Sequence, residues 1–156
     1  MRVAIGSCVL VVSLGAGVLA AQRKPAPPPP PPNPLAAIPA FRCSFPKHVA
    51  TEWVNGAPVS LAGEEEFMFQ ITNINMRRGA ARIVGSGGGT AEVAVVLTAT
   101  GLNVIEQTGL GNFILTTVYT AGGQDRVYRA THSRHLGDLS ALPSVSQHFG
   151  TCEATK

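Results

Sequence analysis

Apolar and polar residues alternate along most of the chain that follows residue 40. Apolar side chains occupy every second position in residues 67–72, and residues 91–100 repeat the pattern. The segments 112–120 and 126–135 are rich in β-branched and aromatic residues between polar ones. A period of two places alternate side chains on opposite faces of a β-strand, so each of these segments is a predicted strand. Further strand-like segments are 41–45, 102–108 and 145–152.

Glycine-containing turns separate these segments at intervals of roughly ten residues, which is typical of antiparallel hairpins. The most glycine-rich turn is Gly85–Gly89. No segment has the 3.6-residue apolar stripe of an amphipathic helix. The sequence therefore predicts an all-β domain, an antiparallel meander of about seven or eight strands. Such a meander protects its edges by closing into a small barrel or by folding into a β-sandwich, and the alternation favours neither.

The first 20 residues have the composition of a secretory signal. Arg2 precedes an apolar run that ends in small residues at Ala20. We therefore predict a signal peptide at 1–20, cleaved after Ala20 or one residue later. The alternative is an uncleaved membrane anchor, because the run approaches the ~20 residues that span a bilayer. Arg23 and Lys24 follow the run and oppose that alternative.

Residues 21–40 form a predicted proline-rich linker. The run from Pro25 to Pro34 consists almost entirely of proline, which favours an extended polyproline II rod of roughly 30 Å. We interpret it as a spacer, with a ligand for a proline-binding domain as the alternative. The remaining residues, 41–156, have the usual size of one domain and contain no internal repeat.

Export leaves an even number of cysteines in the chain. Cleavage after residue 20 removes Cys8, so only Cys43 and Cys152 remain. In an oxidising compartment, periplasmic or extracellular, the two are expected to pair. Because Cys43 lies in the first predicted strand and Cys152 in the last, the disulfide would join the two ends of the domain.

Charge excludes one class of partner. Without Arg2, the eleven remaining basic residues exceed the nine acidic ones by two. Such a small and scattered excess does not fit a nucleic-acid-binding protein. Contact with a membrane is expected only if the signal stays uncleaved.

The segment 126–135 contains the densest set of side chains that could bind a metal or ligand or take part in catalysis. His132 and His135 suggest a metal pair, but residues three apart on a strand point to opposite faces. A bulge, or convergence of His48 and His148 from elsewhere, would be needed to build a site. We therefore expect no metal site and no other cofactor.

One face of this strand is the candidate site. Tyr128, His132 and Arg134 share it, and an inward orientation would place His132 and Arg134 near one end of a barrel. A buried arginine needs a partner, and Glu106 or Glu92 could supply the carboxylate. Either these residues form a structural ion pair at the barrel mouth, or they line a pocket for an anionic or polar ligand.

Catalytic residues are not expected. Ser133, His135 and Asp138 are the residue types of a hydrolase triad, but they lie too close in sequence to converge. The Gly-x-Ser-x-Gly turn that exposes a nucleophile is also absent from the sequence.

Short sequence pieces distributed over residues 41–153 have a familiar combination. The pieces are Phe41-x-Cys43, Ile105-Glu-Gln-Thr108, Gly111-Asn112, Thr116-Thr117, His132-Ser-Arg-His135 and Gly150-Thr-Cys152. As a set they resemble a group of small, exported bacterial β-domain proteins of unassigned function, which implies a shared fold and export but no activity. The predicted architecture alone is also similar to exported lysozyme-inhibitor barrels, whose inhibitory motif is not recognisable in this sequence.

Three functional hypotheses follow. The first is an exported, non-catalytic binding or interaction domain for an unknown small ligand or an envelope protein. The second is a secreted inhibitor of a hydrolase, with Gly85–Gly89 as the loop that would enter a cleft. The third is an enzyme that uses a barrel-mouth pocket around His132 and Arg134.

Overall fold

The computed structural model describes residues 32–138 and 141–156, which contain nine strands and one short 3₁₀ turn, η1 (Pro34–Ala37). The expected signal peptide and most of the proline-rich run lie outside these residues. No helix among the described residues is long and apolar enough to cross a bilayer. The strands are β1 (Ala40–Val54), β2 (Ala57–Gly63), β3 (Phe67–Asn75), β4 (Ala80–Gly85), β5 (Thr90–Leu97), β6 (Gly101–Gln107), β7 (Phe113–Tyr119), β8 (Val127–Asp138) and β9 (Ala141–Thr155).

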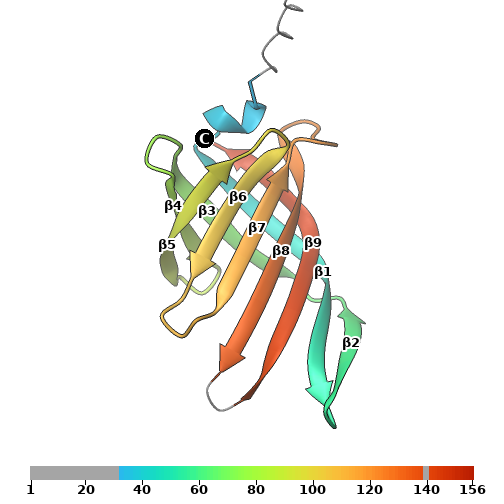
Figure 1. The fold of residues 1–156 in the computed structure, drawn as a ribbon. Coiled ribbons are helices and arrows are strands. Elements are labelled where there is room, and N and C mark those ends of the chain that lie inside the picture. The colour runs from blue at the N-terminus through green and yellow to red at the C-terminus, as the bar shows by residue number, and fades with distance from the viewer. Residues whose placement is uncertain (1–31, 139–140) are drawn as a thin grey trace, which may run out of the picture. The chain divides into compact units, whose positions relative to one another are not determined.

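Eight of the strands close into an antiparallel barrel (Figure 1). From β3 to β9, each strand pairs with the next one in the chain, and β1 pairs with both β3 and β9. The pairing of β1 with β9 removes the free edges that an open sheet would leave. The expected all-β meander is confirmed, and of the two architectures left open it is the barrel that forms.

The expected disulfide lies at the seam where the barrel closes. Cys43 of β1 and Cys152 of β9 are direct register partners, and their sulfur atoms are bonded. Both side chains are fully buried and belong to the core. The bond therefore joins the first and last barrel strands, as predicted.

Alternate residues of each strand fill the barrel interior. On β5, Val93 and Val95 are buried, whereas the residues on either side of them, Glu92, Ala94 and Val96, are exposed. This is the side-chain alternation of a strand with one face toward a core. The other buried apolar side chains of the barrel are Phe41, Cys43, Phe45, Phe69, Ile71, Ala81, Leu102, Val104, Val118, Ala130, Cys152 and Ala154.

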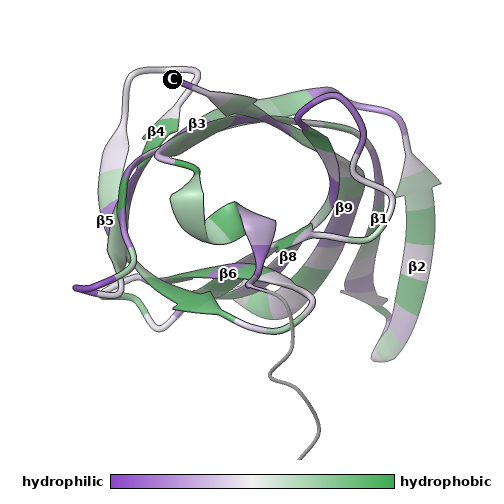
Figure 2. Ribbon diagram, turned by 90° about the horizontal axis from the view of Figure 1, so that it is seen from above, coloured by the Kyte–Doolittle hydropathy of each residue, from purple (hydrophilic) through white to green (hydrophobic). Residues whose placement is uncertain are grey.

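The end of the barrel at which β1 begins is plugged by η1, and Figure 2 shows this turn within the ring of strands. Leu35 is fully buried in the core. Asn33 caps the turn by accepting a hydrogen bond from the Leu35 amide, and its side-chain amide donates to the Thr98 carbonyl at 2.7 Å. The packed domain thus begins before Phe41, whereas the sequence placed residues 21–40 in the linker. Alternation could not reveal a single buried leucine among prolines and alanines.

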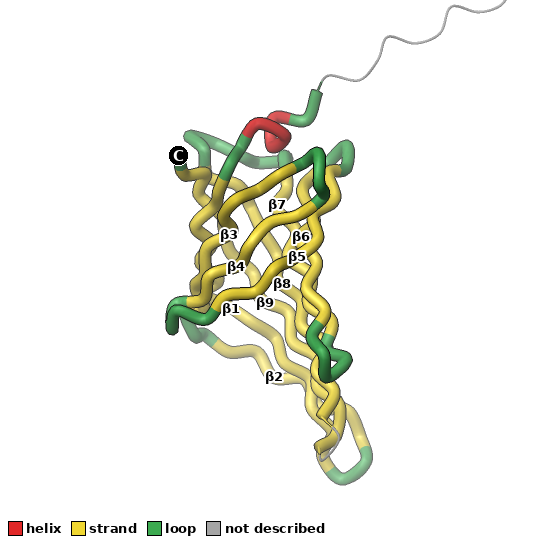
Figure 3. Tube along the Cα trace, turned by 90° about the vertical axis from the view of Figure 1, so that its left-hand side faces the viewer, coloured by secondary structure: helices red, strands yellow, loops and turns green. Residues whose placement is uncertain are grey.

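One strand, β2, is not part of the barrel. It pairs with the portion of β1 that extends beyond the barrel (Figure 3). Residues 41–45 of β1 pair with β3, and residues 48–54 pair with β2. A two-residue turn, Asn55-Gly56, joins β1 to β2 with positive φ angles of 52° and 80°, as type I′ hairpins require. We call residues 48–63 the β1–β2 arm. Among the described strands, its outer strand, β2, pairs with β1 alone.

Candidate functional site

The candidate face of β8 points into the barrel. Ala130 and His132 are buried, and Tyr128 and Arg134 are partly buried. Tyr128, however, lies at the plugged end, where its ring meets Phe41 edge to face at a centroid distance of 6.0 Å. The predicted set is therefore divided between the two ends of the barrel, and Tyr128 does not share a pocket with Arg134.

Strand register brings three histidines side by side near the other end. His132 of β8 pairs with His148 of β9, and His148 pairs with His48 of β1. The ring centroids of His132 and His148 are 5.7 Å apart, and those of His48 and His148 are 5.3 Å apart. We call these three residues, with Thr116 of β7 beside His132, the histidine row.

The sequence offered little sign of this row. All three residues lie in predicted strands or next to one, but alternation gives the face of a side chain and not its strand-to-strand partner. Gly63 of β2 makes room for the row, because a Cβ at that position would lie 2.5 Å from Cε1 of His48.

His132 is a neutral imidazole with unused hydrogen-bonding capacity. Its Nδ1 is 2.9 Å from the hydroxyl oxygen of Thr116. Its Nε2 is buried and has no hydrogen-bond partner among the described residues. Burial, reinforced by His148 and Arg134, lowers the pKa of His132 from 6.5 to about 3, because the charged form loses its hydration.

The neighbouring imidazoles have a similar environment. Burial, followed by the nearby His48 and Arg134, lowers the pKa of His148, while Glu65 opposes the shift. Nδ1 of His148 and Nδ1 of His48 are also buried, and neither has a hydrogen-bond partner in the part of the chain that the structure describes. No three histidine, cysteine, aspartate or glutamate side chains in the described ranges gather in an arrangement that could hold a metal ion.

His135 diverges from His132, as strand geometry predicts. Its side chain is exposed on the outer wall, where its ring lies 6.4 Å from that of Phe113. Ser133 has the same strand parity and faces away from the interior. The side chain of Asp138 lies outside the described part of the molecule.

Arg134 and Glu106 form the next row toward the barrel end. Glu106 of β6 pairs with Ile114 of β7, and Ile114 pairs with Arg134. Each charged side chain is partly buried. Arg134 places its guanidinium carbon 5.9 Å from the centroid of the Phe67 ring. Among the side chains that the structure describes, which do not include that of Asp138, no ion pair joins Arg134 to a carboxylate, so the predicted pairing with Glu106 does not form.

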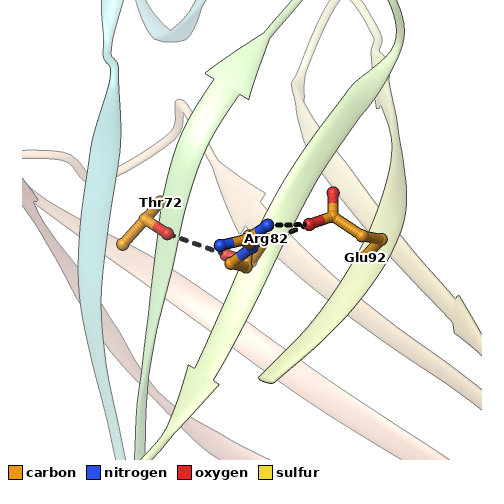
Figure 4. Close-up of polar contacts among 3 residues, drawn as sticks. All are labelled: Thr72, Arg82 and Glu92. Atoms are coloured by element: carbon orange, nitrogen blue, oxygen red, sulfur yellow. Dashed lines mark hydrogen bonds and ion pairs between the residues drawn. The ribbon is translucent and has the colours of Figure 1, made fainter.

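Glu92, the other predicted partner of Arg134, is occupied elsewhere. It accepts a hydrogen bond of 2.7 Å from Nε of Arg82 and forms an ion pair with the same guanidinium at 2.6 Å. Figure 4 shows this pair bridging β4 and β5, with the Thr72 hydroxyl donating to the Arg82 carbonyl. Because Glu92 alternates with the buried Val93, it faces away from the barrel interior.

A pocket of about 120 Å³ lies between these rows. We call this end of the barrel the pocket end. Aromatic and aliphatic side chains form most of the wall, and three polar side chains interrupt it. The lining residues are Phe67, Phe69, Ile83, Gly85, Glu106, Ile114, His132 and Arg134.

The imidazole of His132 is poorly suited to proton transfer. A general base is most effective when its pKa lies near the working pH, and the pKa of His132 lies far below neutrality. The pocket instead offers a fixed cation, a carboxylate and one neutral hydrogen-bonding nitrogen. Comparison of the chain with protein-family models, with curated proteins and with solved structures finds no match.

Proposed function

We propose that the protein is an exported, non-catalytic binding domain that holds a small ligand at the pocket end of its barrel. The observation that carries the proposal is that Arg134, Glu106 and His132 line one largely apolar pocket, and that Nε2 of His132 is buried there without a hydrogen-bond partner among the described residues. A polar atom withdrawn from water without a partner costs free energy, and a bound ligand would supply that partner.

Other features support the same proposal. The opposite end of the barrel is plugged by Leu35, so the interior is approached from the pocket end. The Cys43–Cys152 disulfide supports export, because such bonds persist in oxidising compartments. The enzyme hypothesis needs a carboxylate within hydrogen-bond reach of His132, yet among the described residues this imidazole bonds to Thr116 alone.

The test is a fragment screen followed by nuclear magnetic resonance on the labelled full chain. The library should contain small amines, carboxylates, zwitterions and neutral amides. We expect at least one fragment to shift the amide signals of Glu106 and Arg134. Ile114→Trp, which fills the pocket, should abolish that response. Leu115→Trp is the matched control, because its side chain lies on the opposite face of the same strand.

The proposal fails if no fragment moves those amide signals. It also fails if a fragment that does move them binds equally well to a correctly folded Ile114→Trp variant. Should that variant not fold, Ile83→Phe is the alternative, because it fills the same pocket with a smaller increase in side-chain volume.

A second candidate function, inhibition of an exported hydrolase, is favoured by the β1–β2 arm. The arm carries exposed apolar side chains at Trp53, Val54 and Leu61, and β2 keeps a free strand edge. A projecting edge strand can enter a partner's cleft by strand addition. The loop expected to do this, Gly85–Gly89, is instead a tight turn closed by two backbone hydrogen bonds.

Lysozyme is the first hydrolase to assay, because the predicted architecture is similar to that of lysozyme inhibitors. We expect saturable inhibition that Trp53→Ala combined with Val54→Ser weakens by about tenfold or more, as at apolar interface centres. Val96→Ser is the control, since Val96 is as exposed as Val54, at 48% against 49%, but lies on the barrel wall. Equal inhibition by all variants, or none by the wild type, would count against this function.

A further inference from the structure

The pocket end contains one positive and one negative side chain that are held apart. Glu106 and Arg134 lie on either side of Ile114 in one register row. Two strand spacings separate their Cα atoms by roughly 10 Å. Among the described side chains, which exclude that of Asp138, no ion pair involves Glu106 or Arg134, although both line the same pocket.

We infer that the pocket selects small zwitterions, molecules that carry both an ammonium and a carboxylate group. This inference rests on the proposed binding function and specifies its ligand class. The carboxylate would lie against Arg134, whose guanidinium suits planar oxyanions. The ammonium would lie against Glu106. A ligand with only one charge would leave the other side chain without a partner in a partly buried site.

The rest of the pocket fits a compact ligand of this class. A cavity of roughly 150 Å³ is sufficient for benzene, which has six heavy atoms. The volume here, about 120 Å³, therefore suits a zwitterion of about that size or slightly smaller. Phe67, Ile83 and Ile114 would contact its hydrocarbon part. His132 is 4% exposed, and its unpartnered Nε2 can add one hydrogen bond.

A panel of six compounds isolates the contribution of each charge. L-alanine, β-alanine and 4-aminobutyrate carry both charges at increasing separation. Propionate carries only the negative charge, propylamine only the positive charge, and propionamide neither. Dissociation constants are to be measured from the amide shifts of Glu106 and Arg134 in the full chain. We expect at least one zwitterion to bind about tenfold to a hundredfold more tightly than both propionate and propylamine.

Two neutral substitutions assign the charges. Arg134→Gln should remove the pocket's preference for the zwitterion over propylamine. Glu106→Gln should remove the pocket's preference for the zwitterion over propionate. Arg82→Gln and Glu92→Gln are matched controls, because they make the same changes to a pair on the outer wall of the barrel. Neither control should alter the affinities.

Two outcomes would overturn the inference. In the first, propionate binds as tightly as every zwitterion, and Glu106→Gln leaves the affinity for propionate unchanged. The ligand class would then be anionic, and the proposed binding function of the pocket would stand. If none of the six compounds moves the pocket amide signals, the zwitterion inference falls. The broader fragment screen with Ile114→Trp then decides separately whether the pocket binds any small ligand.

Discussion

His132 couples the stability of the barrel to pH. The folded protein holds its imidazole neutral, with a pKa of about 3, whereas an unfolded histidine has a pKa near 6.5. Between these values the unfolded chain takes up a proton that the folded chain does not. The contribution of His132 to stability is therefore complete above pH 6.5 and decreases as the pH falls toward 3.

We expect this single residue to lower the free energy of unfolding by about 2 kcal/mol between pH 7 and pH 5. His132→Phe should remove that part of the pH dependence, although it also loses the Thr116 hydrogen bond. Urea denaturation at both pH values measures the difference. The control is His135→Phe, on the exposed outer wall, and it should retain the wild-type pH dependence. Equal dependence in His132→Phe and the wild type would show that the imidazole is not held neutral.

Gly150 determines how closely β9 approaches β1. A Cβ at this position would overlap the backbone carbonyl oxygen of Ser44, at the point where the pairing of the two strands shifts register. The obstacle is backbone and not the end of a flexible side chain. We expect Gly150→Ala to destabilise the protein by about 2 kcal/mol or more, as overpacking does.

The control for Gly150→Ala is Gly109→Ala. Gly109 has no atom within 4 Å of the Cβ position, and its φ angle is not in the left-handed region. Its substitution should change the midpoint of urea denaturation little. A neutral effect at both glycines would mean that β9 can move away from β1 without cost.

At the scale of elements, η1 shows what a strand pattern cannot predict. Leu35 has no alternating neighbours, and its burial depends on the barrel end that it closes. Leu35→Ala should cost about 2–5 kcal/mol, the usual effect of truncating a buried leucine. Leu110→Ala is the matched control, because Leu110 is 78% exposed in a turn. If both substitutions have the same small effect in thermal denaturation, η1 is not part of the core.

Alternation was sufficient to assign faces within each strand. It correctly placed His132 and Arg134 on one face and His135 on the other, because the period of two is a local property of the backbone. Which of these faces points inward was left open. It could not assign neighbours across strands. The row that contains His48 and His148, and the outer-wall pairing of Glu92 with Arg82, both depend on register. Register is determined by the whole sheet and not by any one segment.

The β1–β2 arm exposed a second limit of the sequence pattern. Asn-Gly is a pair typical of two-residue hairpin turns, and at Asn55-Gly56 the structure has such a hairpin. The length of the hairpin was not predictable, because residues 57–63 are exposed on both faces or nearly so. A strand with no buried face gives no alternation signal.

At the scale of the whole molecule, the two barrel ends have different chemistry. Leu35 closes one end with an apolar plug, and the other end combines the histidine row with the separated charges of Arg134 and Glu106. The apolar plug and the polar pocket therefore lie toward opposite ends of the barrel. The β1–β2 arm extends from the same β1 strand that contributes His48 to the row. No residue of β1 lines the pocket itself, so a partner on the arm would reach the pocket only through the histidine row.

The barrel closes at the seam between β1 and β9. Removing the disulfide measures how much this bond contributes to the stability of the closed barrel. Cys43 and Cys152 are 109 residues apart in the chain. A link across so long a loop restricts the unfolded chain and is worth about 4–5 kcal/mol in loop-closure theory. We expect Cys43→Ala with Cys152→Ala to lower the free energy of unfolding by about that amount, with a marked fall in Tm.

The backbone pairing of the seam should survive loss of the disulfide. β1 and β9 remain register partners from Ala40 to Thr51, and the small side chains that replace the sulfurs leave that ladder intact. The double variant should therefore keep the wild-type β-sheet signal in far-ultraviolet circular dichroism at low temperature. It should also keep the amide shifts of Glu106 and Arg134, because neither cysteine lines the pocket. A variant that loses these pocket signals while it stays folded would show that the covalent link, and not only strand pairing, positions the two charges.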